Sequence, residues 1–261
     1  MNPLFDTKLF LLDMDGTFYL GEKLLPGALE FLEAVRKAGK DYLFLTNNSS
    51  RSLSDYVKRL RGFGADVTEE DIFSSSDATL IYLEQQHFSK EILLFGTPSL
   101  EQQFTEAGYH IRSKKPEAVV LGFDQTIDYK KLTLLCDAVR SGLPYIATHP
   151  DYNCPVEGGF IPDIGAIMAF VRASTGRDAD VIIGKPNGFI AKAAASRKGL
   201  AVEELCMVGD RLYTDIALGN HCNVKTALVF SGETSPAEYE SQKDVHATVT
   251  AENIGELIAY L

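Results

Sequence analysis

Acidic, hydroxyl and lysine side chains follow four apolar stretches of the sequence, at the points where these stretches end. Asp13 and Asp15 come after LFLL, and Asp210 comes after LCMVG. Thr46 closes DYLFLT, and Lys185 follows DVIIG. Carboxylates gathered at one point require a cation, and a site of oxygen atoms suits Mg²⁺. One carboxylate can also act as a nucleophile while another transfers a proton, so these residues favour phosphoryl transfer.

The other polar residues at these ends suit the binding of a phosphoryl group. Thr46 and Asn47 offer hydroxyl and amide groups, and Lys185 offers a positive charge that can stabilise phosphoryl oxygens. Gly16 permits a tight turn that would bring backbone N–H groups to the same oxygens. A simpler interpretation makes Asp13 and Asp15 helix-capping or turn residues, but the four strand ends together favour the chemical interpretation.

The stretches that carry these residues have the pattern of buried parallel strands. They are near-continuous in Leu, Val, Ile and Phe without alternation, as is typical of strands covered on both faces. We expect strands at residues 8–13, 41–46, 91–96, 117–122, 144–149, 180–184, 204–210 and 225–232. Ligands of such sheets bind at the carboxyl ends of the strands, where the polar residues should therefore gather.

Helical spacing of apolar residues separates the expected strands. Residues 28–35, 132–139 and 254–261 carry apolar side chains at i, i+3, i+4 and i+7. Ser52 and Asp55 form the pattern of a capping box. Alternating strands and helices predict a doubly wound, parallel α/β sheet. The strands are many for one sheet in 261 residues, so we expect two α/β domains.

The composition excludes several classes of partner. A formal net charge of −11 argues against a nucleic-acid partner and against an anionic membrane surface. No apolar run reaches the roughly 18 residues of a membrane span, and the first residues lack a signal-peptide pattern. A cytoplasmic protein is the expectation.

The order of the motifs resembles that of the haloacid dehalogenase superfamily of phosphohydrolases. The later stretch 147–167 is similar to the p-nitrophenylphosphatase-like branch, whose large α/β cap (class IIA) is inserted between the second and third motifs. The motifs that carry the resemblance are D-x-D-G-T at 13–17, T-N-N at 46–48, G-K-P at 184–186 and G-D-x-x-x-x-D at 209–215. The resemblance implies a Rossmann-like catalytic core of residues 1–76 and 183–261, with the cap at 77–182.

The resemblance also implies a role for each acidic residue. Asp13 would be the nucleophile, forming an aspartyl-phosphate, and a ligand of Mg²⁺. Asp15 would be the general acid and base and would offer its backbone carbonyl to the metal. Asp210 would be the third protein ligand, and Asp215 would hold the region of Asp210 and Lys185 together; capping or pairing with a neighbour is the simpler role for Asp215.

The remaining motif residues would contact the substrate. Thr46 and Asn47 would bind the phosphoryl group with Asn48 beside them, and Lys185 would neutralise the charge of both nucleophile and phosphate during catalysis. Residues 18–25 would form a mobile flap. The chain departs from the branch at Thr148-His149-Pro150-Asp151, where T-N-P-D is common, and at 162–166, where P-G-x-G-A is common. We interpret His149 as a hinge or loop residue.

These observations predict a Mg²⁺-dependent phosphatase, a hydrolase of phosphoric monoesters. Its substrate would be a small phosphorylated metabolite, such as a sugar phosphate or a nucleotide, and a homodimer is compatible with caps of this kind. The alternative from another class is a phosphoacceptor signalling module with little turnover. Asp15 argues against a dehalogenase, and the short stretch from Thr17 to Thr46 leaves no room for the helical cap usual in phosphomutases.

Overall fold

The computed structural model describes residues 2–156 and 158–261, which divide into two compact units. The first unit contains residues 1–46, 56–73 and 185–261, and the second contains 47–55 and 74–184. The predicted cap, 77–182, lies within the second unit, and the segment 47–55, which directly follows the second motif's threonine, is grouped with it.

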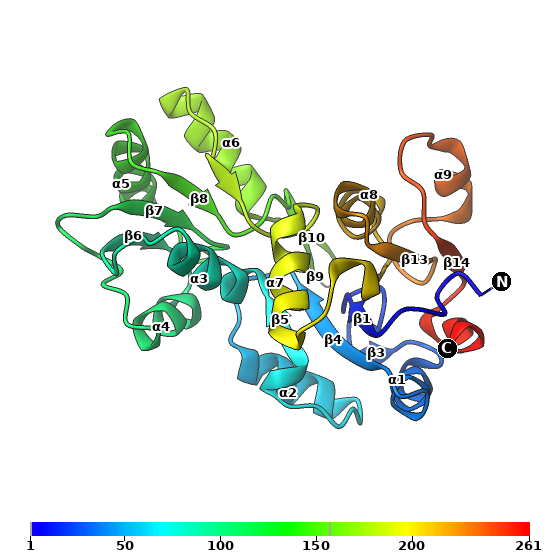
Figure 1. Cartoon of the computed structure of the whole chain (residues 1–261). Coiled ribbons are helices and arrows are strands. Elements are labelled where there is room, and N and C mark those ends of the chain that lie inside the picture. The colour runs from blue at the N-terminus through cyan, green and yellow to red at the C-terminus, as the bar shows by residue number, and fades with distance from the viewer. Residues whose placement is uncertain (1, 157) are drawn as a thin grey trace. The chain divides into compact units, whose positions relative to one another are not determined.

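A six-stranded sheet forms the centre of the first unit, in the order β14-β13-β12-β1-β4-β5. The pairs from β14 to β4 are all parallel. Helices lie on both faces, with α7 and α8 on one and α1 beside the C-terminal η4 on the other (Figure 1). The elements are β1 (Leu9–Leu12), β2 (Tyr19–Leu20), β3 (Lys23–Leu24), α1 (Ala28–Lys37), β4 (Asp41–Thr46), η1 (Glu69–Asp71), β5 (Ile72–Ser74), α7 (Gly188–Lys198), η2 (Val202–Glu204), β12 (Leu205–Gly209), η3 (Leu212–Ile216), α8 (Ala217–Cys222), β13 (Lys225–Val229), α9 (Pro236–Ser241), β14 (Val249–Ala251) and η4 (Ile254–Tyr260).

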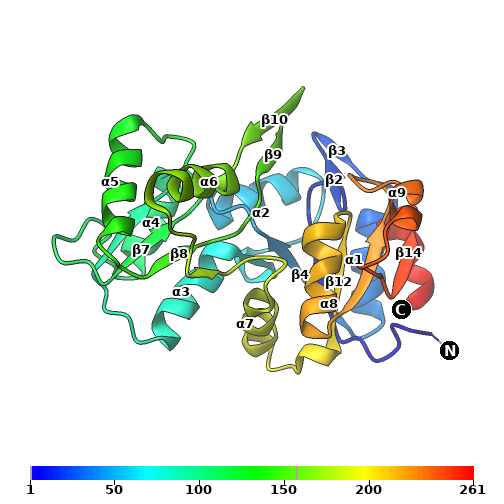
Figure 2. The same ribbon diagram turned by 90° about the horizontal axis from the view of Figure 1, so that it is seen from above.

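The second unit has its own four-stranded parallel sheet, in the order β11-β8-β7-β6. An antiparallel hairpin, β9–β10, extends away from the rest of this unit (Figure 2). Helix α2 (Leu53–Gly62) crosses the boundary between the units. The other elements are α3 (Ser75–Gln85), β6 (Ile92–Phe95), α4 (Pro98–Glu106), β7 (Ala118–Leu121), α5 (Tyr129–Arg140), β8 (Tyr145–Ala147), β9 (Asn153–Val156), β10 (Gly159–Pro162), α6 (Ile164–Thr175) and β11 (Val181–Ile182).

All eight expected strands are present, each at or just inside its expected range, and the doubly wound α/β class is confirmed. Ser52 and Asp55 form the expected capping box, because each main-chain N–H donates to the other side chain at 3.2 Å. The helix predicted over 254–261 is wrong in type: Ile254–Tyr260 is a 3₁₀ helix. Apolar residues of this pattern nevertheless pack inside the protein, since Ile254 and Leu257 are buried.

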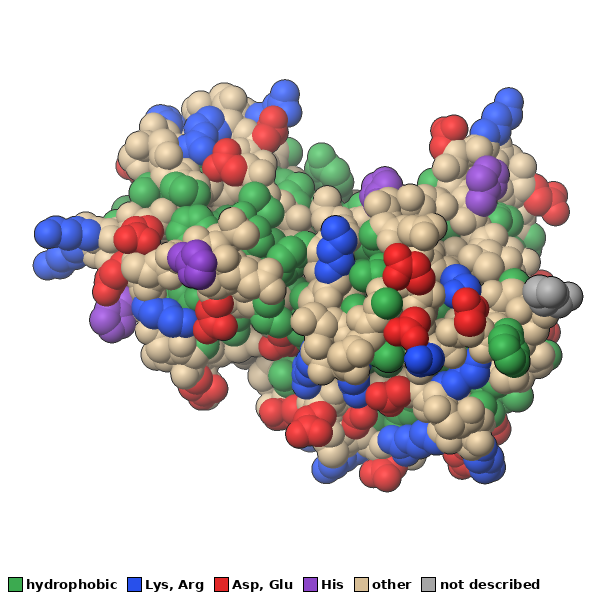
Figure 3. Space-filling view, in the orientation of Figure 1, with side chains coloured by type: hydrophobic (Ala, Val, Ile, Leu, Met, Phe, Trp, Pro, Cys, Tyr) green, Lys and Arg blue, Asp and Glu red, His purple; other side chains and the backbone are tan. Residues whose placement is uncertain are grey.

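Among the described residues, no helix is both long enough and apolar enough to span a membrane. On the face drawn in Figure 3, acidic and basic side chains are interspersed.

Candidate active site

Three neighbouring strands of the first unit bring the acidic motif residues together. Strand β1 lies between β12 and β4, and Leu12 is in register with Val208 on one side and Phe44 on the other. The N–H of Asp13 continues the ladder by donating to the carbonyl of Val208 at 2.9 Å. The residues that follow β1 and β12 therefore emerge at the same edge of the sheet.

Asp13, Asp210 and Asp215 form a compact carboxylate group at this edge. Their nearest ligand oxygens all lie within 4.8 Å of one another, and all three residues are buried. Asp215 lies on a π-helical turn, Leu212–Ile216, of a kind that recurs at functional sites. Three buried carboxylates repel one another strongly unless cations neutralise them.

Lys185 supplies one such charge. Its Nζ lies 2.5 Å from Oδ1 of Asp13 and 2.7 Å from Oδ1 of Asp215, and it donates to the carbonyl of Leu45 at 3.3 Å. Burial of Lys185 works against the ammonium form, but the two ion pairs outweigh it, so the pKa of Lys185 is raised. The lysine therefore stays charged and joins the residues that follow β1 and β12.

The carboxylate of Asp210 packs so closely against Gly16 and Gly232 that only glycine fits at these two positions. Its Oδ2 accepts from the N–H of Glu233 at 2.7 Å, and its Oδ1 accepts from the hydroxyl of Thr17 at 3.3 Å. A Cβ at Gly16, whose φ is +84°, would lie 2.3 Å from Oδ2, and a Cβ at Gly232 would lie 2.0 Å from it. The glycine of D-x-D-G-T thus permits both the turn and the close approach of Asp210.

The charge of this carboxylate group favours a bound cation. Burial, followed by the proximity of Asp13 and Asp215, raises the pKa of Asp210 to about 8. Burial also raises the pKa of Asp215 to about 6, although Lys185 opposes this shift. The oxygen-only donor set of Asp13 and Asp210 fits a hard divalent ion, which would relieve the repulsion that Lys185 leaves.

Asp15 lies beside this group at the base of a small hairpin. Burial, and then the charge of Asp13, raises the pKa of Asp15, while Arg59 opposes the shift. The N–H of Gly16 donates to the carbonyl of Tyr19 at 2.8 Å, which closes the turn. A carboxyl group with a raised pKa holds its proton at higher pH, as a general acid must.

The predicted flap, residues 18–25, contains the hairpin β2–β3. Arg59, which no sequence motif identifies, contacts this hairpin. The guanidinium of Arg59 lies over the ring of Tyr19 at 4.5 Å from its centroid and donates to the carbonyl of Gly21 at 2.6 Å. Arg59 belongs to an amphipathic helix, and nothing in its spacing distinguishes it from a solvated arginine.

The T-N-N motif divides between the two units. Thr46 ends β4 in the first unit and is buried, whereas Asn47 and Asn48 belong to the second. Nδ2 of Asn47 donates to both carboxylate oxygens of Asp151 at 3.2 Å. Oδ1 of Asn48 accepts from the N–H of Ser50 at 2.9 Å and from its hydroxyl at 2.7 Å. The Asn48 side chain therefore stabilises the loop locally, the role that asparagine commonly has in turns.

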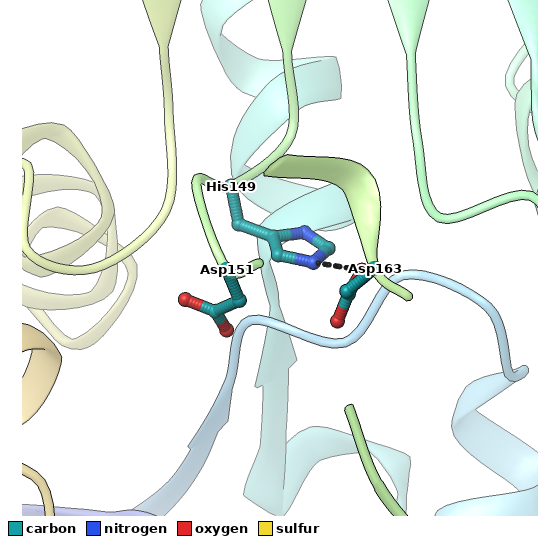
Figure 4. Close-up of side chains that lie close together, drawn as sticks. All are labelled: His149, Asp151 and Asp163. Carbon is teal, nitrogen blue, oxygen red and sulfur yellow. Dashed lines mark hydrogen bonds and ion pairs between the residues drawn. The ribbon is translucent and has the colours of Figure 1, made fainter. Parts of the chain in front are cut away.

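A second group of potential metal ligands lies in the second unit, where His149, Asp151 and Asp163 approach one another (Figure 4). The ring nitrogens of His149 contact the Thr148 hydroxyl at 2.9 Å and Oδ1 of Asp163 at 3.1 Å. With Asp151 bonded to Asn47, each of these three side chains has a hydrogen-bonding partner within the protein. His149 lies in the loop after β8, which agrees with its interpretation as a hinge or loop residue.

Comparisons with known proteins agree with this geometry. A family model described as haloacid dehalogenase-like hydrolase matches residues 10–110, and a HAD-hydrolase-like model matches residues 182–257. The chain is 34% identical to a 5'-nucleotidase, YutF, of Bacillus subtilis, over 97% of this chain and 98% of the relative. It is also 34% identical to an acid sugar phosphatase of Staphylococcus aureus, with the same coverage. The crystal structure of a 4-nitrophenylphosphatase from Thermotoga maritima is similar over 99% of both chains, with a TM-score of 0.95 and 43% identity.

Proposed function

Because the chain belongs to the haloacid dehalogenase-like phosphatases, in the p-nitrophenylphosphatase branch with an α/β cap domain, we propose the chemistry of its site as follows. It is a Mg²⁺-dependent phosphomonoesterase that acts on a small phosphorylated metabolite through an aspartyl-phosphate. The observation that carries the proposal is the buried Lys185 bridge between Asp13 and Asp215, with Asp210 in the same carboxylate group.

In the first step, a carboxylate oxygen of Asp13 attacks the phosphorus atom. The new O–P bond forms as the bond to the ester oxygen breaks, and Asp15 gives its proton to the departing alkoxide. The raised pKa of Asp15 supports this assignment, because it shifts the residue toward the protonated form that a general acid needs. In the second step, Asp15 takes a proton from water as the water oxygen attacks the aspartyl-phosphate, which releases inorganic phosphate and restores Asp13.

Lys185 orients Asp13 before the attack, because its ammonium lies 2.5 Å from the attacking carboxylate. Thr46, Asn47 and Asn48 would bind the transferred phosphoryl group. Asp13, Asp210 and the backbone carbonyl of Asp15 would hold Mg²⁺, which neutralises charge on the phosphoryl oxygens when it is bound. Asp215 supports this arrangement by pairing with Lys185 and by accepting from the N–H of Arg211 at 3.1 Å.

The substrate class is inferred from the relatives. The names of the relatives include a nucleotidase, a sugar phosphatase and a 4-nitrophenylphosphatase, all of which are names for enzymes that act on small phosphate esters. We therefore propose a sugar phosphate, a nucleotide or a similar ester for this chain, with no nucleic-acid or membrane partner. A cytoplasmic location and a homodimer complete the proposal.

The decisive variant is Asp13→Asn, which replaces the nucleophilic oxygen but keeps the shape of the side chain. With Mg²⁺ and p-nitrophenyl phosphate, we expect turnover to fall about ten-thousandfold, since residues that form covalent intermediates cause losses of this order. The matched control is Asp41→Asn, which removes a carboxylate of the same unit that pairs with Lys198 at 2.7 Å near the surface. The control should retain turnover close to that of the wild type.

An ester labelled in its phosphoryl group distinguishes a phosphatase from a phosphoacceptor signalling module. Rapid acid quenching should trap label on the wild type but not on Asp13→Asn, and phosphate should be released in many turnovers. Normal turnover in Asp13→Asn would refute the mechanism. A labelled protein that survives for minutes with little phosphate release would instead favour the phosphoacceptor module.

A further inference from the structure

The contacts of Asn47 give a role to two motifs that the proposed chemistry does not use, 148–151 and 162–166. We propose that Asp151 is a positioning residue, which holds Asn47 in the orientation that binds the phosphoryl group. The inference rests on the proposed function, because it takes Asn47 as a phosphate-binding residue.

Asn47 is held by two residues that lie far from it in the sequence. Its Nδ2 donates to both carboxylate oxygens of Asp151 at 3.2 Å, across 104 positions, and its carbonyl accepts from the hydroxyl of Ser75. Asn47 and Ser75 are both buried. The side chain and the main chain of Asn47 are therefore fixed by different partners, directly after Thr46.

Gly184 packs against the carboxamide of Asn47. A Cβ at Gly184 would lie 2.4 Å from Oδ1 of Asn47, closer than real Cβ contacts allow. The carboxamide is thus packed against a backbone that carries no side chain. A carboxamide that is held in one rotamer loses its conformational entropy when the protein folds. Substrate binding then does not have to fix this side chain, so binding costs less conformational entropy.

Asp151 is itself held by the second of these motifs. The N–H of Gly165 donates to the carbonyl of Asp151 at 2.8 Å, and a Cβ at Gly165 would lie 2.9 Å from the same oxygen. Asp163, which directly follows β10, is bonded to His149 (Figure 4). The glycine of 162–166 therefore allows the start of α6 to approach the backbone of Asp151, and the two motifs meet at this point.

The test uses the full-length protein with Mg²⁺, p-nitrophenyl phosphate as substrate and inorganic phosphate as inhibitor. Asp151→Ala removes the acceptor and should raise the inhibition constant of phosphate about tenfold or more, as expected for a lost hydrogen bond to a charged group. Asp151→Asn keeps one acceptor oxygen and should stay within about threefold of the wild type. The matched control is Asp124→Asn, a buried carboxylate of the same unit that pairs with Lys131 at 2.6 Å. It should leave the inhibition constant unchanged.

A double-mutant cycle separates positioning from a general structural role. If Asp151 acts through Asn47, then Asp151→Ala should change the inhibition constant by less than about twofold in an Asn47→Ala background. An equal effect in both backgrounds, or a folded Asp151→Ala that binds phosphate as the wild type does, would overturn the inference. If Asp151→Ala does not fold, Asp151→Ser takes its place in the cycle, because its hydroxyl is one bond too short to reach the carboxamide.

The single variant Asn47→Ala distinguishes failure of the proposed phosphate-binding role of Asn47 from failure of the positioning role of Asp151. If it binds phosphate as the wild type does, the proposed role of Asn47 fails, and the inference about Asp151 fails with it. If Asn47→Ala weakens phosphate binding but Asp151→Ala does not, only the inference about Asp151 fails.

Discussion

Two groups of buried carboxylates, one in each compact unit, satisfy their charges in different ways. In the first unit, Asp13, Asp210 and Asp215 face one another, and Lys185 pairs with two of them. In the second unit, Asp151 and Asp163 accept from an amide and approach an imidazole. Both groups have the spacing of metal ligands, but the first brings three carboxylates together, whereas the second combines two carboxylates with an imidazole.

The difference indicates which group is built for chemistry. Burial and mutual repulsion raise the pKa of Asp210 to about 8, so the folded protein holds this group in an unfavourable state. Perturbed carboxylates of this kind concentrate at functional sites. In the second group the side chains bond to one another and to neighbours, and one of these bonds joins Asn47 and Asp151 across 104 positions, which is typical of a structural network.

Among variants that leave the nucleophile Asp13 in place, the largest expected effect comes from Lys185→Met, which removes the charge that balances the first group. Turnover should fall about a thousandfold, because the ammonium stabilises the developing charge. The free energy of unfolding should fall by about 3 kcal/mol or more, because Asp13 and Asp215 lose their buried partner. Steady-state kinetics and urea unfolding measure the two effects.

The control for this variant is Lys198→Met. Lys198 pairs with Asp41 at 2.7 Å in the same unit, but both side chains are partly exposed. Exposed ion pairs contribute about 0–1 kcal/mol, so this variant should be close to the wild type in stability and turnover. Equal losses in the two variants would remove the distinction between the carboxylate group and an ordinary ion pair.

The core of the fold could be predicted because its strands are buried on both faces. Continuous apolar runs such as Leu9–Leu12 and Leu205–Gly209 identify such strands without further information. The short strand Val249–Ala251 and the exposed hairpin β9–β10 escaped prediction, since a few residues with mixed exposure carry no distinctive pattern. The 3₁₀ form of Ile254–Tyr260 was also hidden, because its apolar spacing suits an α-helix as well.

The residues of the candidate site could be predicted where they follow strands, but their contacts with distant loops could not. Its acidic residues and Lys185 follow strands, and strand ends can be recognised in a sequence. The contacts of Asp210 with the N–H of Glu233, and of Asn47 with Asp151, depend on how distant loops pack. Asp151 and Glu233 each follow an expected strand, 144–149 and 225–232, but nothing in the spacing identifies the residue that each of them contacts.

A second prediction concerns Asp210→Asn and the pH dependence of stability without metal. The pKa of Asp210 is about 8 in the folded protein and 3.8 as its ordinary value. Between these pH values the unfolded chain loses the proton that the folded protein keeps, so the stability of the wild type should fall as pH rises from about 4 to about 8. Asp210→Asn removes this contribution and should be more stable than the wild type at about pH 8, by on the order of 1–3 kcal/mol.

Urea unfolding in a chelator at about pH 5, 7 and 8 measures this slope. Adding Mg²⁺ should stabilise the wild type at the highest pH and have little effect on Asp210→Asn, which should also lose turnover. A wild type whose stability rises steadily with pH over this interval would contradict the assignment of a crowded, protonated carboxylate.

The smallest expected effect comes from Asp163→Asn in the second group. The substitution weakens the contact with His149 at 3.1 Å and keeps an oxygen that can accept from the N–H of Ile164. We expect the free energy of unfolding to fall by about 1–2 kcal/mol, as for one buried hydrogen bond, and turnover to fall by less than about tenfold. Thermal unfolding and p-nitrophenyl phosphate kinetics test both. A loss of turnover as large as that of Lys185→Met would place His149 and Asp163 with the catalytic residues, and the contrast between the two carboxylate groups would then be wrong.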